Sequence, residues 1–81
     1  MDTDIFGRDI FVDMYVIAQD GVSLFYGKVI KFTDSSIIIR GGYADYNSIL
    51  KRIVRRTSSK TKIIIINDSF VIDHIENLLK D

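Results

Sequence analysis

The sequence predicts a mainly β fold with one inserted helix (α+β). We expect a small five-stranded β-barrel of order β-β-β-α-β-β, followed by a short C-terminal helical turn. Isoleucine provides 15 of the 81 residues, and β-branched residues favour strands. Apolar runs with strand-like spacing lie on both sides of a central stretch, residues 43–62, that has helical periodicity. A chain of this length fits one domain, which we place at residues 9–81 after a flexible acidic N-terminus at residues 1–8.

The first two strands are expected on either side of a tight turn. Residues 9–18 alternate between two faces, as a strand does, and an Asp-Gly pair follows, in which both residues tolerate positive φ. The second strand is expected at residues 23–32. Its core residues Val29 and Phe32 lie three positions apart, so a bulge or sharp bend near Ile30 is needed to place both on one face.

A third strand is expected at residues 37–40 and a fourth at residues 62–66. Between them, apolar residues fall on one side of a helix and predict that residues 44–56 are helical. These residues are Tyr43, Tyr46, Ile49, Leu50, Ile53 and Val54. The isoleucine runs in both strands are apolar on both faces and need cover on both sides. A second subunit could supply that cover, and we therefore expect a homo-oligomer.

The C-terminal segment allows two interpretations. Asn67-Asp68 is a hairpin turn before a fifth strand at residues 69–75, or Asp68 caps a helix that extends to Lys80. In the second case the apolar side of the helix comprises Val71, Ile72, Ile75, Leu78 and Leu79.

Two segments, residues 20–40 and 63–75, resemble the two motifs of the Sm-like small β-barrel family. The residues that match the spacing of the first motif are Gly27, Val29, Phe32 and Ile37-Ile38-Ile39. The second segment resembles an apolar strand, a tight polar turn and another apolar strand. The resemblance covers about 35 of the 81 residues and favours the strand interpretation of residues 69–75, ending near His74 or Ile75.

The sequence departs from this family at the positions that form its RNA-base pocket. Ile66-Asn67 stands where the family has Arg-Gly, and the Asn expected before the third strand is replaced by Ser36 or Ile37. The predicted helix also lies between strands three and four, whereas the family places its helix before the first strand. The resemblance therefore implies a ring-forming barrel more than it implies that pocket.

Charge is partitioned along the chain although the net charge is zero. Residues 1–20 carry a net charge of −4, residues 21–66 carry +7 and residues 67–81 carry −3. The basic block at residues 21–66 predicts an anionic partner for the middle of the chain. The alternative is that the acidic ends neutralise the basic block, within the chain or across a subunit interface.

Seven basic residues are candidate phosphate-binding residues: Arg40, Lys51, Arg52, Arg55, Arg56, Lys60 and Lys62. Arg offers a planar fork to phosphate oxygens, and Lys offers a point charge. Tyr26 and Tyr43 are candidate stacking residues for a base. The alternatives are a solvated helix face for the basic residues and a core role for the tyrosines of the apolar stripe, Tyr43 and Tyr46.

No catalytic motif is present, and we expect a non-enzyme without a metal or cofactor. The chain has no cysteine, and His74 is its single histidine, so the usual metal-ligand sets are missing. It has no glycine-rich phosphate loop. The N-terminus is acidic, unlike a secretion signal, and no apolar run reaches the ~20 residues of a membrane span. We expect a cytoplasmic protein, in the host cytoplasm if the chain is phage-encoded.

Three functions fit these observations. The first is a homo-oligomer that binds RNA or DNA phosphates on the basic helix face. The second is an oligomer that binds or sequesters a small nucleotide, for example a cyclic one, which would be useful to a phage. The third is a protein–protein interaction module in which the basic helix binds an acidic surface.

Overall fold

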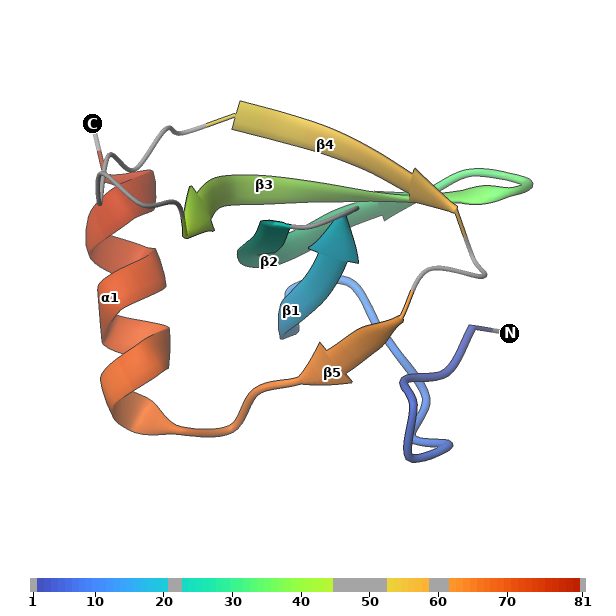
Figure 1. Ribbon diagram of the computed structural model, residues 1–81, viewed down its shortest axis with the longest axis horizontal. Helices are drawn as coiled ribbons and strands as arrows, with labels where there is room; N and C mark the ends of the chain where they lie inside the picture. The colour runs from blue at the N-terminus through green and yellow to red at the C-terminus, as the bar shows by residue number, and fades with distance from the viewer. Residues whose placement is uncertain (1, 21–22, 45–52, 59–61, 81) are drawn as a thin grey trace.

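Antiparallel strands form one sheet, and a C-terminal helix packs against it (Figure 1). The computed structural model describes residues 2–20, 23–44, 53–58 and 62–80. The strands are β1 (Tyr15–Asp20), β2 (Ser23–Phe32), β3 (Ser36–Ala44), β4 (Ile53–Ser58) and β5 (Ile63–Ile65), and the helix is α1 (Ser69–Leu79). Four of the five predicted strands overlap β1, β2, β3 and β5, and the mainly β class is confirmed.

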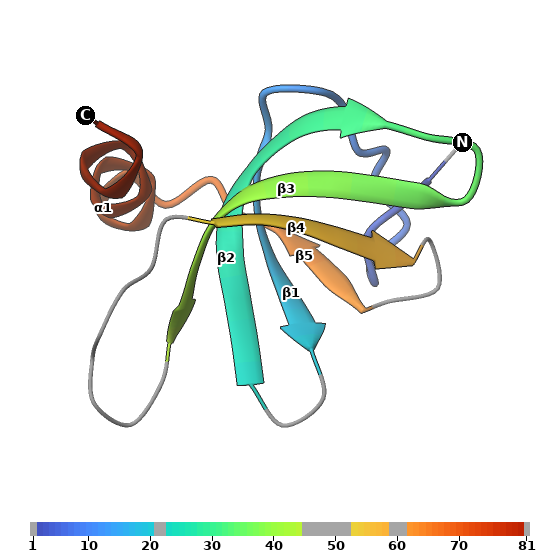
Figure 2. The same ribbon diagram turned by 90° about the horizontal axis from the view of Figure 1, so that it is seen from above.

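The sheet is open, so the predicted closed barrel is wrong. Its strand order is β4-β3-β2-β1-β5, and the described residues show no pairing between β4 and β5. The physical reason lies at β5, which has three residues and whose outer edge is occupied by the segment before β1. The sheet is nevertheless strongly curved (Figure 2). The register of β2 against β3 shifts between Val29 and Lys31, which confirms the bulge predicted near Ile30.

Two predicted elements have the wrong secondary structure. The helix expected at residues 44–56 is wrong at both of its described ends, because β3 extends to Ala44 and β4 begins at Ile53; residues 45–52 lie outside the described residues. The strand expected at residues 69–75 is the start of α1. The Asp68 side chain accepts hydrogen bonds from two backbone N–H groups of the first turn, as a helix N-cap does.

The start of β1 also differs from the prediction. The strand was expected from residue 9, but Asp13 has a φ of 75°, which a strand does not allow, and β1 begins at Tyr15.

The core lies on one face of the sheet. Its buried residues are Ile10, Val16, Ala18, Phe25, Val29, Ile37, Ile39, Ile63 and Ile65. Gly27 and Gly41 lie opposite each other in β2 and β3. A Cβ atom on Gly41 would meet the Tyr26 carbonyl oxygen and lie 2.6 Å from the Gly27 Cα, so this pair lets the two backbones approach closely.

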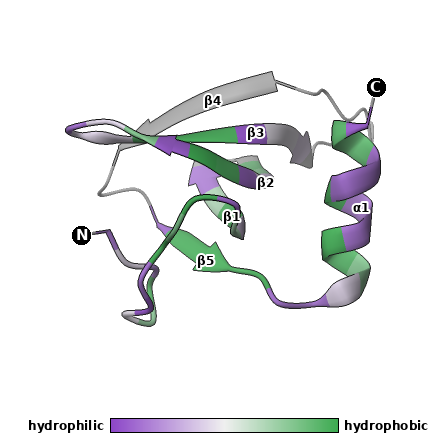
Figure 3. Cartoon of the chain, turned by 180° about the vertical axis from the view of Figure 1, so that it is seen from behind, coloured by the Kyte–Doolittle hydropathy of each residue, from purple (hydrophilic) through white to green (hydrophobic). Residues whose placement is uncertain are grey.

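The helix α1 packs on the other face of the sheet, which we call the outer face. It contacts β3 and β2, and Ile75 is its fully buried residue. Apolar residues lie along β5 and along one side of α1 (Figure 3). The candidate site lies on this outer face, beside α1.

Candidate binding groove

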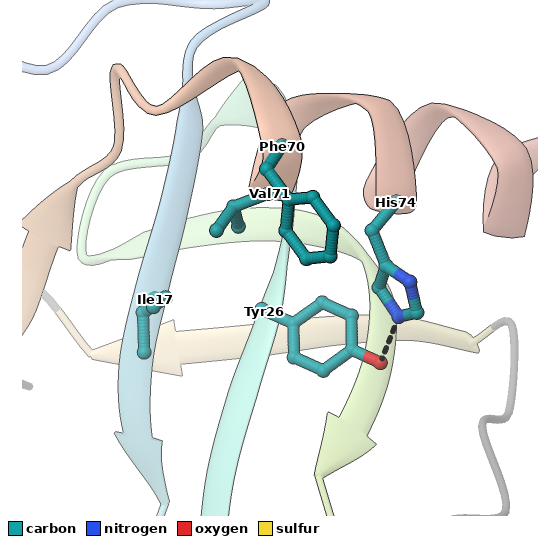
Figure 4. Close-up of a pocket in the computed structure, with 5 residues that line it drawn as sticks. All are labelled: Ile17, Tyr26, Phe70, Val71 and His74. Carbon is teal, nitrogen blue, oxygen red and sulfur yellow. Dashed lines mark hydrogen bonds between the residues drawn. The ribbon is translucent and has the colours of Figure 1, made fainter.

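An apolar row crosses the outer face beside α1. Ile17 of β1 lies opposite Tyr26 of β2 on one side and opposite Ile64 of β5 on the other. Residues opposite each other in antiparallel strands have their side chains on the same face. A pocket of about 290 Å³ opens where this row meets α1, and it is lined by Ile17, Tyr26, Phe70, Val71 and His74 (Figure 4).

The first two turns of α1 supply the helical wall of the pocket. Phe70, Val71 and His74 all extend from the helix toward the sheet side of the pocket (Figure 4). The N-cap Asp68 fixes the first turn, with its carboxylate 2.9 Å from the Phe70 nitrogen. Phe70 is 81% exposed, although it is the largest apolar side chain of the helix. An aromatic ring is therefore held at the pocket mouth without being covered.

Tyr26 and His74 form the polar end of the pocket. The Tyr26 hydroxyl lies 3.3 Å from His74 Nε2, and the two rings are tilted by 51° with their centroids 5.7 Å apart. Burial raises the pKa of the Tyr26 hydroxyl, so this group stays neutral and is able to donate a hydrogen bond. The rest of the wall is apolar. A pocket of this kind suits an apolar or aromatic group better than a charged one.

A second hollow of about 160 Å³ lies next to the first. It is lined by Ile5, Ile17, Gln19, Leu24, Lys62 and Ile64. Ile17 lines both hollows, so they adjoin on the same face, and we call the two together the outer-face groove. Leu24 and Ile5 are each about half exposed at its rim.

The predicted basic site is not assembled on a helix. Arg55 and Arg56 lie in β4, opposite Ile39 and Ile38 of β3, because residues 53–58 pair with β3 as a strand. Arg40 lies in β3, half-buried and opposite Lys28. Lys62 is exposed at the rim of the groove. The remaining predicted residues, Lys51, Arg52 and Lys60, lie outside the described residues.

The two candidate stacking tyrosines have different environments. Tyr43 packs edge-on against the core residue Phe25, with ring centroids 5.0 Å apart, which matches the alternative core role. Tyr26 lines the pocket and is 9% exposed. The exposed ring beside it is Phe70, which the sequence analysis did not single out. The residue in the sequence that could have indicated Phe70 is Asp68, since an N-cap at Asp68 places Phe70 in the first turn of a helix.

Two further features were looked for in the described part of the chain. It contains no group of three or more His, Asp or Glu residues able to hold a metal ion. None of its helices is long and apolar enough to cross a membrane.

Comparisons of the chain with protein-family models, curated proteins and solved structures find no match. Function is therefore inferred from the groove.

Proposed function

We propose that the protein is a non-catalytic interaction domain that holds an apolar side chain of a partner protein in the outer-face groove. The observation that carries this proposal is the exposure of Phe70 beside an apolar pocket, with Leu24 and Ile5 further along the same surface. Contiguous apolar surface of this kind is typical of sites where proteins associate. This corresponds to the third function considered from the sequence, but with an apolar groove in place of a basic helix.

The expected energetics support a protein partner. Covering one exposed Phe or Leu side chain contributes about 1.5–3 kcal/mol. An aromatic residue at the centre of a contact, surrounded by residues that exclude water, is the usual arrangement of a binding hot spot. Phe70 lies between the pocket and solvent, and the polar residues Lys62 and Gln19 line the second hollow of the groove.

Peptide selection tests the proposal. A random peptide library displayed on phage is panned against the wild-type domain, and enriched peptides are then measured against two variants. We expect Phe70→Ser to lose at least about tenfold in affinity, since one hot-spot aromatic contributes 1.4 kcal/mol or more.

Phe11→Ser is the matched control, because Phe11 is also an exposed phenylalanine, at 51%, but lines a separate hollow with Asp2, Ile10 and Phe32. This variant should retain full binding. The proposal fails if no peptide is enriched, or if both variants lose binding equally.

Nucleic-acid binding is the second candidate, supported by the position of β4. This strand carries Arg55-Arg56 and lies at an end of the sheet order. Exposed Phe70 also offers a surface on which a base could stack. Fluorescence anisotropy with labelled RNA and DNA oligonucleotides tests this function, and Arg55→Glu/Arg56→Glu should abolish a strongly salt-dependent signal. Salt-independent binding, or unchanged binding by this double variant, would exclude it.

The distant resemblance to Sm-like proteins stays part of the proposal. The bulge in β2 at the position of the motif supports it, whereas the open sheet and the C-terminal helix depart from it. The third candidate is a small nucleotide, whose aromatic base would enter the same pocket. Mononucleotides added to a thermal unfolding assay would reveal binding as a rise in the unfolding midpoint.

A further inference from the structure

The outer edge of β5 is covered by the segment that precedes β1. The Ile63 carbonyl accepts a hydrogen bond from the Ile5 N–H at 2.9 Å. The Ile65 N–H donates to the Asp4 carboxylate at 3.2 Å, and the Ile65 carbonyl accepts from the Arg8 guanidinium group at 3.2 Å. Residues 2–10, which we call the arm, therefore take the place of a neighbouring strand along an edge that would otherwise be open.

The arm closes on itself. Thr3 and Asp9 form a bridge, and the Ile10 N–H donates to the Asp2 carbonyl at 3.0 Å. The two ends of the arm are thereby held together. Ile10 is buried in the core, so the arm is anchored to the domain by one apolar side chain as well as by the edge of β5.

Asp4 organises the turn within the arm. Its side chain is fully buried, and its carboxylate accepts hydrogen bonds from the Phe6 N–H, the Arg8 N–H and the Arg8 guanidinium group. Burial raises the pKa of Asp4, but these bonds and the one from the Ile65 N–H outweigh it and lower the pKa to about 2. Gly7 completes the turn with a φ of 83°. The arm is thus held by hydrogen bonds within itself and to β5.

The connection from the arm to β1 has the features of a hinge. It comprises residues 11–14, and Phe11 and Val12 are each about half exposed. Asp13 has a φ of 75° and is the one non-glycine residue with positive φ in the described part of the chain. This backbone conformation is costly for a residue with a side chain, and an extended connection would relieve it.

We propose that the arm is exchanged between two copies of this chain, so that residues 2–10 of one copy cover the β5 edge of the other and bury Ile10 in its core. Every contact within the arm and with β5 is kept on exchange. The two forms differ in the hinge alone, which turns back in the monomer and extends in the dimer. The proposed partner of the β5 edge is therefore the arm of a second copy of this chain.

Hinge variants test the exchange by sedimentation velocity over a range of protein concentrations. Asp13→Pro fixes φ near −65° and removes the N–H that donates to the Val29 carbonyl, so we expect a shift toward dimer. Asp13→Gly accepts positive φ freely and should shift the population toward monomer. Asp13→Asn is the matched control, because it removes the carboxylate near Lys28 but keeps a residue that tolerates the same φ. If φ decides the exchange, this variant should behave as the wild type.

Cross-linking identifies the exchanged segment and keeps the native hinge. The chain has no cysteine, and Ile5 and Lys62 line the same hollow. An Ile5→Cys chain and a Lys62→Cys chain are mixed, refolded at high concentration and treated with a short thiol cross-linker. We expect mixed pairs joined between these two positions, identified by mass spectrometry. The proposal is overturned if no mixed pair forms, or if a folded Asp13→Pro chain stays monomeric at every concentration.

Discussion

Replacing Ile75 with alanine should detach α1 from the sheet. Ile75 is 0% exposed and is the buried residue of the helix, whereas Phe70 on the same helix is 81% exposed. Truncating a fully buried isoleucine to alanine costs 2–5 kcal/mol, because transfer energy is lost and a cavity remains. We take about 3 kcal/mol for this site. A chain of 81 residues has a total stability of about 4–12 kcal/mol, so this loss is a large fraction of it.

Urea unfolding of Ile75→Ala and Phe70→Ala measures the difference directly. Both substitutions give the same helix propensity at the new residue, and they differ in what the lost side chain contacts. We expect Phe70→Ala to change the free energy of unfolding by less than about 0.5 kcal/mol. Equal losses for the two variants, or a loss below about 1 kcal/mol for Ile75→Ala, would refute the docking of α1 through Ile75.

Three further predictions follow from single contacts. Gly41→Ala should destabilise the domain by more than about 2 kcal/mol in urea unfolding, because its Cβ would meet the Tyr26 carbonyl and neither backbone is free to move. Asp68→Ala should cost about 1 kcal/mol through loss of the N-cap, measured by urea unfolding followed by circular dichroism, while Asp73→Ala in the middle of the helix should cost less. The pKa of Asp4 is lowered, so its carboxylate stabilises the fold above about pH 4, and this stabilisation is lost as the pH falls toward 2. The difference in free energy of unfolding between wild type and Asp4→Asn should therefore shrink between about pH 4 and pH 2, measured by urea unfolding. A difference that stays constant over this range would contradict the prediction.

The strands near the sheet centre could be predicted because local pattern and tertiary pairing agree there. Val29 and Phe32 required a bulge from their spacing alone, and the register shift lies between Val29 and Lys31. The segment around Ile53 failed for the opposite reason. Its apolar residues fit a helical stripe, but Ile53 lies opposite Gly41 in a strand pair. That pairing is between residues separated along the chain, and a local periodicity does not contain it.

The groove and the arm could not be predicted from the sequence, and the physical reasons differ. Asp68 is compatible with a hairpin turn and with a helix N-cap. Phe70 reaches the pocket mouth in the second case, because it then lies in the first turn of a helix. Asp4 belongs to residues 1–8, which the sequence predicts to be a flexible acidic N-terminus, because carboxylates are rarely buried without partners. Its partners include Ile65, 61 positions away, and such a contact leaves no local signal.

The arm and the groove are physically joined at β5. The outer edge of this strand receives the arm, while Ile64 on its outer face lines the groove. Ile5 belongs to the arm and also lines the groove, so arm exchange would leave the composition of the groove unchanged but build it from two chains. A peptide that contacts Ile5 in the groove would then bind with the same affinity to monomer and dimer, because it meets the same side chains. Peptide binding and dimerisation would therefore vary independently. Asp13→Gly would change the fraction of dimer and leave the affinity for the peptide unchanged.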